Sequence, residues 1–145
     1  MVMPQVNVFG SLIANHSDKA LDVEGGSADN LARLIQFSPT GGSNQRFRFE
    51  PLGDGFFVIR IEHSGKVLDI EGGSNANLAR LIQFDQHGGP NQRFAVEELP
   101  DGHFMLRAMN SGKMLDVEGG SLFDRAGIIQ FDRTGRPNQQ WSFVV

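Results

Sequence analysis

A repeat of 47 residues runs through the whole chain and limits how it can fold. Residues 20–27, ALDVEGGS, return as VLDIEGGS at 67–74 and as MLDVEGGS at 114–121. Both steps are 47 residues, and across residues 21–47 the first two copies agree at 20 of 27 positions. A fixed period of this length is typical of architectures in which each unit buries its apolar face against the next one.

The three copies lie at roughly residues 5–50, 51–97 and 98–145. An open array of repeats needs terminal units with a polar outer face, and the three copies leave no residues for such units. A closed arrangement is therefore favoured. With 145 residues, the chain has the length of one ordinary domain with its own core. We expect a single closed domain over residues 1–145.

Short apolar runs separated by turn residues predict about four strands in each copy. In the second copy these strands are expected at residues 57–61, 66–70, 81–84 and 92–96. Twelve short strands can remove their exposed edges by closing into a barrel that is capped by hairpins. We therefore predict an all-β protein, a β-trefoil of three 47-residue repeats with pseudo-three-fold symmetry.

Two local features depart from this regular pattern. The first strand of copy one is expected to pack less tightly than its counterpart, because Gly10, Ser11 and Ala14 stand in place of Phe57, Val58 and Ile61. A single helical turn at residues 30–33 or 77–80 is an alternative to a loop, because an Asn can act there as the N-cap before Leu-Ala-Arg. Such a turn would not change the fold class.

Composition bears on partners and location. The formal net charge is -4 and the chain has no basic stripe, so the counterion release that drives nucleic-acid binding has no evident source. The absence of Cys means that packing, not disulfides, stabilises the fold. No signal peptide is recognised, and no apolar run approaches the roughly 20 residues of a membrane-spanning helix. We expect no membrane insertion and a soluble chain that is cytoplasmic or exported without a signal. A homodimer is possible.

The repeated residues resemble the ricin-type β-trefoil lectins, which also occur as carbohydrate-binding modules attached to glycosidases. Each copy has a Leu-Asp strand, a Gly-rich turn, an apolar-Gln-aromatic strand and a loop that ends in Asn-Gln-x-aromatic. The last element is similar to the family's Gln-x-Trp signature and reads QRF at 45–47, QRF at 92–94 and QQW at 139–141. The resemblance implies a non-catalytic protein that binds glycans, with galactose-type sugars as the expected ligands. Several weak, shallow sites would gain avidity through multivalency.

The resemblance also assigns candidate site residues. In such lectins the Asp accepts hydrogen bonds from two adjacent sugar hydroxyls, an aromatic ring stacks on the apolar face of the sugar, and the Asn bonds another hydroxyl. Carboxylates, amides and aromatic faces are chemically suited to these three roles. The predicted sugar-binding sets are Asp22, Phe37 and Asn44; Asp69, Phe84 and Asn91; and Asp116, Phe131 and Asn138.

Other repeated residues have different expected roles. A supporting hydrogen bond that orients the Asp is expected from Gln45, Gln92 and Gln139. Core packing is expected of Phe47, Phe94 and Trp141. Side chains alternate between the two faces of a strand, so we expect three further glutamines to point away from the sugar: Gln36, Gln83 and Gln130. We expect the three repeated glutamates to be exposed to solvent, and they are a second set of candidate ligands: Glu24, Glu71 and Glu118.

The sequence departs from the family pattern in two ways. The stacking ring is Phe in every copy, where Trp or Tyr is commoner, so each site is expected to be weak. Ile35, Ile82 and Ile129 occupy the place where many members have a sugar-facing Gln. Simpler roles also stay open: the Asp as a turn residue that bonds the backbone of the Gly-Gly loop, and the Phe as a core residue.

Other functions are less well supported by the residues. His16, His63, His87 and His103 show no metal-ligand spacing, and the chain has no phosphate-binding loop, nucleophile elbow or Cys, so no metal or cofactor is expected. An Asp and a Glu in each copy would suit a glycosidase, yet three-fold repetition suits a multivalent binder better. The alternative is a β-trefoil interaction protein, such as a protease inhibitor or a scaffold, that binds no sugar. Its first candidate contact is the divergent segment 122–125.

Overall fold

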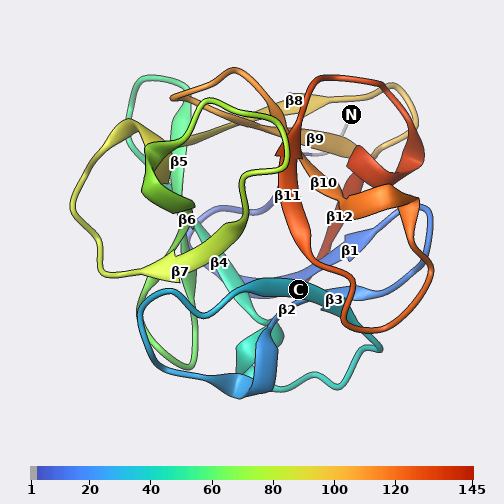
Figure 1. The fold of residues 1–145 in the computed structure, drawn as a ribbon, viewed down its shortest axis with the longest axis horizontal. Coiled ribbons are helices and arrows are strands. Elements are labelled where there is room, and N and C mark those ends of the chain that lie inside the picture. The colour runs from blue at the N-terminus through green and yellow to red at the C-terminus, as the bar shows by residue number, and fades with distance from the viewer. Residues whose placement is uncertain (1–2) are drawn as a thin grey trace.

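The computed structural model describes residues 3–145, so the first two residues of the expected 1–145 domain lie outside the described part. Each repeat contributes four β-strands (Figure 1). Repeat 1 contains β1 (Phe9–Ala14), β2 (Ala20–Val23), β3 (Leu34–Phe37) and β4 (Phe47–Pro51). Repeat 2 contains β5 (Phe56–Ile61), β6 (Val67–Ile70), β7 (Leu81–Phe84) and β8 (Phe94–Glu98). Repeat 3 contains β9 (Phe104–Ala108), β10 (Met114–Val117), β11 (Ile128–Phe131) and β12 (Trp141–Val144).

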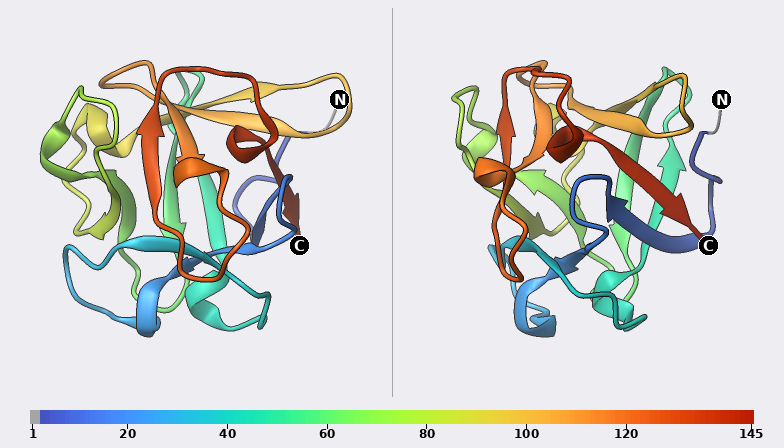
Figure 2. Two further views of the ribbon diagram at one scale, coloured as in Figure 1. Left: turned by 45° about the vertical axis from the view of Figure 1, so that its right-hand side comes forward. Right: turned by 90° about the vertical axis from the view of Figure 1, so that its right-hand side faces the viewer.

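Six of the strands form a closed antiparallel barrel. The outer strands of each repeat pair with each other, as β1–β4, β5–β8 and β9–β12, and neighbouring repeats pair as β4–β5, β8–β9 and β12–β1. The other six strands form three hairpins, β2–β3, β6–β7 and β10–β11. Figure 2 shows the hairpins at one end of the barrel and the C-terminus at the other. A six-stranded barrel capped by three hairpins is the predicted β-trefoil, and the fold class is confirmed.

The core fills the barrel with apolar side chains from all three repeats. The expected core residues Phe47, Phe94 and Trp141 are at most 1% exposed. The ring of Phe49 meets the rings of Phe57, Phe104 and Phe143 edge to face, at centroid distances of 5.8, 6.3 and 5.4 Å. Such aromatic pairs add about 0.5–1.5 kcal/mol each beyond the burial of their area. One aromatic cluster therefore joins strands from all three repeats.

The expectation that the first strand packs loosely is wrong at Gly10. The ring of Phe143, on the neighbouring strand β12, fills the space beside this glycine, and a Cβ at Gly10 would lie 2.6 Å from the Cζ atom of Phe143. Leu12 and Ala14 on the same strand are fully buried. A large side chain on the partner strand thus compensates for a small one on β1.

Six short 3-10 turns accompany the strands, at positions that were not predicted. Three follow the Leu-Asp strands, η1 (Glu24–Gly26), η3 (Glu71–Gly73) and η5 (Glu118–Gly120). Three precede the last strand of each repeat, η2 (Ser43–Gln45), η4 (Pro90–Gln92) and η6 (Pro137–Gln139). The first kind contains a glycine with positive φ, as Gly25 at +67° does, a conformation that favours glycine.

The helical turn considered at residues 30–33 or 77–80 is not formed. Leu31 and Leu78 instead have positive φ angles of 77° and 76°, which end any helix. The side chain of Asn30 caps no helix, because its Nδ2 donates to Oδ2 of Asp85 and its Oδ1 accepts from the Asp85 N–H. These turns therefore serve as joints between one repeat and the next.

Three buried glutamines complete the joints between repeats. The Nε2 group of Gln36, in repeat 1, donates to the carbonyls of Ser121 and Phe123 in repeat 3, both at 2.8 Å. The equivalent bonds of Gln83 run to repeat 1 and those of Gln130 run to repeat 2. All three side chains are fully buried. The hairpins are thus linked in a ring, repeat 3 to 1, 1 to 2 and 2 to 3. These glutamines line none of the three pockets that the predicted sugar-binding residues line, in agreement with the expected orientation of their side chains.

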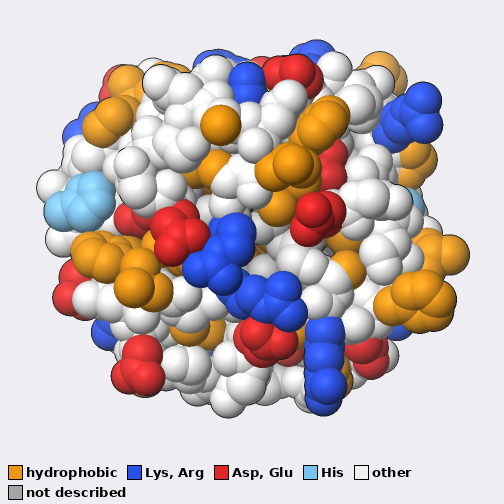
Figure 3. Space-filling model, in the orientation of Figure 1, with side chains coloured by type: hydrophobic (Ala, Val, Ile, Leu, Met, Phe, Trp, Pro, Cys, Tyr) orange, Lys and Arg blue, Asp and Glu red, His pale blue; other side chains and the backbone are white. Residues whose placement is uncertain are grey.

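The hairpin end of the molecule carries closely spaced charges of both signs. Figure 3 shows basic and acidic side chains next to each other in the middle of this face. Arg33 pairs with Glu24 at 2.7 Å and Arg80 with Glu71 at 2.9 Å. No helix within residues 3–145 is long and apolar enough to cross a membrane.

Candidate functional site

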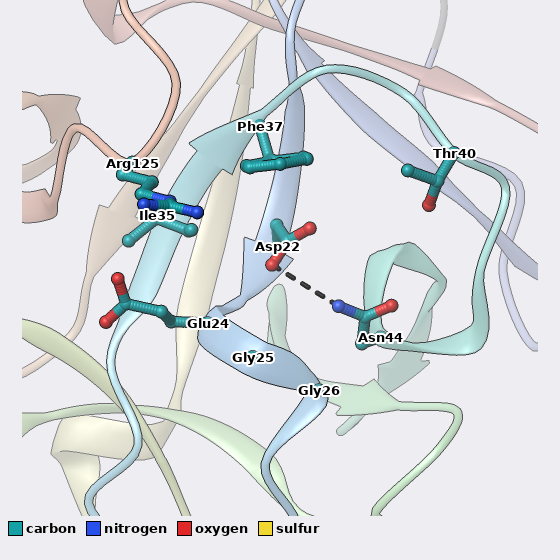
Figure 4. A pocket seen from close by; sticks show the side chains of 9 residues that line it. All are labelled: Asp22, Glu24, Gly25, Gly26, Ile35, Phe37, Thr40, Asn44 and Arg125. Atoms are coloured by element: carbon teal, nitrogen blue, oxygen red, sulfur yellow. Dashed lines mark hydrogen bonds between the residues drawn. The ribbon is translucent and has the colours of Figure 1, made fainter.

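Each repeat forms one hollow beside its hairpin, and the predicted site residues line it. In hollow 1, Asp22 comes from β2, Phe37 from the end of β3 and Asn44 from η2 (Figure 4). Hollow 2 contains Asp69, Phe84 and Asn91, and hollow 3 contains Asp116, Phe131 and Asn138. Their volumes are about 370, 520 and 240 Å³. The three predicted sets are therefore brought together, each within one repeat.

The bottom of hollow 1, which we call its floor, is the Asp22 carboxylate with its hydrogen-bond partners. Asp22 is 5% exposed. Its Oδ1 accepts from Nδ2 of Asn44 at 3.3 Å, and its Oδ2 accepts from Nε2 of Gln45 at 2.8 Å. The same Gln45 Nε2 donates to the Ser38 carbonyl, and its Oε1 accepts from the Thr40 N–H. Gln45 thus fixes the carboxylate from below, which is the hydrogen bond predicted from the sequence.

The floors of the other two hollows repeat this geometry. Oδ2 of the Asp accepts from Gln92 at 2.8 Å in hollow 2 and from Gln139 at 2.9 Å in hollow 3. Oδ1 accepts from Asn91 at 3.1 Å and from Asn138 at 3.3 Å. The Gln side chains are fully buried and line none of the hollows, so they hold the Asp in place from behind.

The floor presents hydrogen-bond acceptors to the hollow. Nδ2 of Asn44 donates to Asp22 and to the Val23 carbonyl at 3.2 Å, which occupies both of its N–H groups. Its Oδ1 and the second lone pairs of the carboxylate oxygens stay available. A ligand on this floor must therefore supply hydrogen-bond donors, as a hydroxyl does. The alternative reading of the Asp as a turn residue is not supported within residues 3–145, because its partners are side chains rather than the Gly-Gly backbone.

Burial changes the acidity of the floor. Burial raises the pKa of the carboxyl groups of Asp22, Asp69 and Asp116 above the ordinary Asp value. The hydrogen bond from the supporting Gln acts in the opposite direction and favours the charged form. Each carboxylate is thus held partly dehydrated, which strengthens its hydrogen bonds to a ligand that replaces water.

The wall of each hollow is apolar. Phe37, Phe84 and Phe131 are half-buried and line the hollows, so they are not members of the core. Ile35 and Ile82 also line hollows 1 and 2 and add aliphatic surface to the wall. The wall thus offers an aromatic edge or face and an aliphatic surface above the polar floor.

The repeated glutamates lie beside the hollows in a different environment. The strand ends before each Glu, which begins the 3-10 turn. Glu24 accepts from Arg33 at 2.7 and 3.1 Å, and these hydrogen bonds lower the pKa of Glu24. Arg80 lowers the pKa of Glu71 in the same way, whereas Gly127 stands in the equivalent place of repeat 3. Two of the three glutamates are thus held ionised in ion pairs.

The upper edge of the hollows, which we call the rim, differs between repeats. Its first position is Thr40 in hollow 1, His87 in hollow 2 and Thr134 in hollow 3. Nδ1 of His87 accepts from the Gly89 N–H, which leaves Nε2 as the protonated nitrogen of the neutral ring. That nitrogen lies 3.5 Å from Oδ2 of Asp69. Hollow 2 therefore contains a donor of its own beside the carboxylate.

A second part of the rim comes from the neighbouring repeat and was not predicted. Arg125, in repeat 3, lines hollow 1, and Leu31, in repeat 1, lines hollow 2. In hollow 3 an arginine of the same repeat, Arg136, is part of the lining. The sequence places Arg125 in the divergent segment 122–125, but the repeat pattern does not show which hollow it reaches.

The sequence matches one protein family over nearly its whole length. The family model described as "Ricin-type beta-trefoil lectin domain-like" matches residues 7–84 and 86–145. The chain belongs to the ricin-type β-trefoil lectin family. This membership supports carbohydrate binding as the general function of the protein. A comparison with curated protein sequences finds no match.

Solved structures of this lectin fold agree with the assignment. The designed three-fold symmetric protein ThreeFoil is 45% identical, with a TM-score of 0.93 over 94% of this chain and 98% of its own. An exo-β-1,3-galactanase from Clostridium thermocellum is 31% identical over 99% of this chain, with a TM-score of 0.93, and the chain spans 31% of its length. A ricin B-like lectin from Macrolepiota procera, solved with lactose, has a TM-score of 0.85 at 17% identity, with 99% of both chains covered. The last likeness shows the fold alone.

The histidines and carboxylates in the described part of the domain are spread over the molecule rather than gathered at one point. Within residues 3–145, no group of three or more His, Asp or Glu side chains is arranged to hold a metal ion. Two of the histidines contact backbone carbonyls of another repeat, His16 that of Ser121 and His63 that of Ser27, both at 2.7 Å. His16 and His63 are therefore further links between repeats.

Proposed function

We propose that this lectin binds galactose-type sugars non-catalytically in its three hollows, with Asp, Phe and Asn as the contact residues of each. The observation that carries the proposal is the floor of acceptors, repeated three times beneath an apolar wall. Two adjacent sugar hydroxyls would donate to the carboxylate, a third to the Asn oxygen, and the C–H face of the ring would lie against the Phe. This proposal assigns the roles to Asp22, Phe37 and Asn44 and to their counterparts.

The ligand class rests on the lectin family and on its structural relatives. One relative is named as a galactanase and another was solved with lactose, a galactose-containing sugar. The hollows are shallow and their stacking ring is Phe, which gives each site a small contact area. We propose that the three weak sites act together on multivalent glycans, where the second and third contacts form at a high effective concentration.

A non-catalytic role fits the state of the carboxylates. Glycosidases use two carboxyl groups, one of which donates a proton. In hollow 1 the Glu24 carboxylate accepts hydrogen bonds from Arg33, which keep it ionised. The Asp22 carboxylate accepts from Asn44 and Gln45. Because Arg33 keeps Glu24 ionised, this group is not set up to donate a proton, which favours binding over hydrolysis.

The proposal is tested by calorimetric titration of galactose at millimolar concentration. The triple variant Asp22→Ala, Asp69→Ala, Asp116→Ala should lose binding by more than about tenfold, since hydrogen bonds to a charged group contribute about 1.5–3 kcal/mol. The control is Asp29→Ala, an exposed carboxylate whose counterpart in repeat 2 is already Ala76. Circular dichroism shows whether the variants stay folded.

The competing function is an interaction protein without sugar binding. The observation that favours it is the exposed loop of repeat 3, in which Leu122 and Phe123 are 60% and 78% exposed. If the unmodified protein gives no response to galactose, lactose or a glycan array, the lectin proposal is wrong. A partner that is lost on Phe123→Ala would then support the interaction protein.

A further inference from the structure

The rims of the three hollows differ in charge, and hollow 1 has a cation that the neighbouring repeat supplies. Arg125 lines hollow 1, whereas Leu31 occupies the equivalent rim position of hollow 2. The third member of this set, 47 residues from each of its neighbours, is Leu78. The exchange of one leucine for arginine therefore gives hollow 1 a different chemistry on an otherwise repeated scaffold.

The backbone of Arg125 is fixed against repeat 1. Its N–H donates to the Gln36 carbonyl at 2.8 Å. The preceding residue, Asp124, accepts from the Ser38 N–H at 2.9 Å and from Nζ of Lys19 at 3.1 Å. The φ angle of Arg125 is 74°, against 77° at Leu31. The arginine is thus held in the same turn as its leucine counterpart, and the two side chains can be exchanged without changing the backbone.

The guanidinium of Arg125 has no hydrogen-bond or ion-pair partner within residues 3–145. An acidic group of the same hollow, Glu24, accepts from Arg33 with both oxygens, and Arg125 acts on it only through its charge, which helps to lower the pKa of Glu24. The positive charge of Arg125 is therefore available to a ligand. A guanidinium presents a planar pair of donors that matches the two oxygens of a carboxylate.

The position of Arg125 suits a ligand that is already seated on the floor. Figure 4 shows Arg125 on one side of hollow 1 and Asn44 on the other, with Asp22 between them. A sugar ring whose hydroxyls donate to Asp22 and Asn44 would direct its other side toward Arg125. Because Arg33 pairs with Glu24, the guanidinium of Arg125 is the unpaired charge that an anionic substituent at that side could meet.

We propose that hollow 1 prefers acidic sugars, with a carboxylate of the bound sugar, or of the sugar linked to it, paired with Arg125. This inference rests on the proposed sugar binding and adds a difference in specificity between the hollows. Hollow 2, with Leu31 on the rim, prefers the neutral sugar. The inference does not extend to hollow 3. Its arginine, Arg136, comes from the same repeat as the rest of the lining and lies close in sequence to Asn138, and this hollow has the smallest volume of the three.

The test compares galactose with galacturonate, in which a carboxylate replaces the C6 hydroxyl, and lactose with sialyllactose, in which the carboxylate is on a linked sugar. Residue-resolved NMR titration of the full chain follows the amides around Asp22, Asp69 and Asp116 separately. At hollow 1 we expect one of the two acids to bind about two- to fivefold more tightly than its neutral partner, the range for an exposed ion pair. The ratio should shrink as salt is added.

Two variants exchange the residues that the chain itself uses at this position. Arg125→Leu should bring the acid-to-neutral ratio of hollow 1 to about one, and Leu31→Arg should raise this ratio at hollow 2 into the two- to fivefold range of an exposed ion pair. Neither change alters the turn, because both residues already occur there, and the amide spectrum checks the fold.

Three outcomes would overturn the inference. If hollow 1 binds galactose but binds neither acid more tightly than its neutral partner, Arg125 does not select the ligand. A preference that persists in Arg125→Leu shows that another group is responsible. If none of the four sugars binds, the proposed lectin function is refuted as well. The missing response to galactose itself distinguishes this outcome from a failure of the Arg125 inference alone.

Discussion

The floors of the three hollows are alike, whereas their rims differ. Every floor contains an Asp that accepts from one Asn and one buried Gln, with distances that agree within about 0.2 Å between repeats. The rim positions vary from threonine to histidine and from leucine to arginine. The difference separates two tasks: the floor and wall determine that a polyhydroxylated ring is bound, and the rim adjusts which ring and how tightly.

The largest expected effect follows from protonating the floors. Because burial raises the pKa of Asp22, Asp69 and Asp116, binding should be lost, by more than about tenfold, as the pH falls through these raised values. The loss should begin above about pH 3.9, where an exposed Asp takes up its proton. These groups bind protons more readily in the folded than in the unfolded chain, so their protonation adds stability as the pH falls.

The measurement is the affinity for galactose over a pH series, with circular dichroism recorded at each pH. Binding that disappears while the spectrum stays native supports the account. Ion pairs such as Arg60–Glu50 act in the opposite direction, since the lowered pKa of Glu50 means that their stabilisation is lost at low pH. An affinity that stays constant well below about pH 3.9, the ordinary Asp pKa, while the protein stays folded would contradict the role of the buried carboxylates.

The next largest effect comes from removing the support beneath one floor. Gln92 is fully buried, donates to Asp69 and to the Asp85 carbonyl, and accepts from the His87 N–H. Gln92→Ala leaves these groups without partners, so the free energy of unfolding should fall by about 1–3 kcal/mol. Hollow 2 should lose about tenfold in affinity or more, because the hydrogen bonds to a mispositioned charged group are weakened.

Denaturant unfolding gives the stability, and NMR titration compares hollow 2 with hollows 1 and 3 in the same molecule. The unmodified hollows are the internal control. Equal losses at all three hollows would show a general change of fold instead of a local loss of support.

A smaller effect is expected from the wall. Phe84 is half-buried in hollow 2, and its removal in Phe84→Ala should weaken sugar binding there by about two- to tenfold, from the loss of about 0.5–1.5 kcal/mol of aromatic contact. Phe84→Trp, with a larger face, is the matched variant and should bind at least as tightly as the unmodified protein. An unchanged affinity in Phe84→Ala would mean that the ring does not contact the sugar.

The smallest effect should come from making one rim like another. His87→Thr gives hollow 2 the residue that Thr40 and Thr134 provide in the other two. The change removes the ring nitrogen that lies 3.5 Å from Asp69, so a sugar hydroxyl reaches that oxygen without competition. We expect about two- to fivefold tighter binding at hollow 2, the scale of a partly exposed polar contact. Weaker binding in the titration would show that His87 itself contacts the sugar.

The sequence was informative about features that lie within one repeat. The 47-residue period, the Gly-bounded apolar runs and the Leu-Asp and Asn-Gln pairs sufficed to predict the barrel strands, the core position of Trp141 and the bond from Gln45 to Asp22. The Gln and the Asp of this bond are 23 residues apart in every copy, and the copies follow at steps of 47 residues, so three instances of one pattern reinforce the same prediction. The sugar contacts of the floor stay a prediction.

Features that depend on how the repeats close could not be predicted in this way. Arg125 reaches the hollow of Asp22 because repeat 3 packs against repeat 1, and nothing in the local pattern around residue 125 indicates its neighbour. The predicted alternative of a helical turn failed at Leu31, because bonds to the next repeat favour a left-handed turn that the propensity of Leu-Ala-Arg does not suggest. The compensation of Gly10 by Phe143 is likewise a contact between opposite ends of the chain.

The central claim is that the three acceptor floors bind a sugar ring, and a crystal structure with galactose tests it most directly. The account predicts galactose in the hollows, with adjacent hydroxyls donating to the carboxylate of Asp22, Asp69 or Asp116 and the ring against Phe37, Phe84 or Phe131. Galactose bound elsewhere on the molecule, with all three floors empty at saturating concentration and clear of crystal contacts, would contradict it.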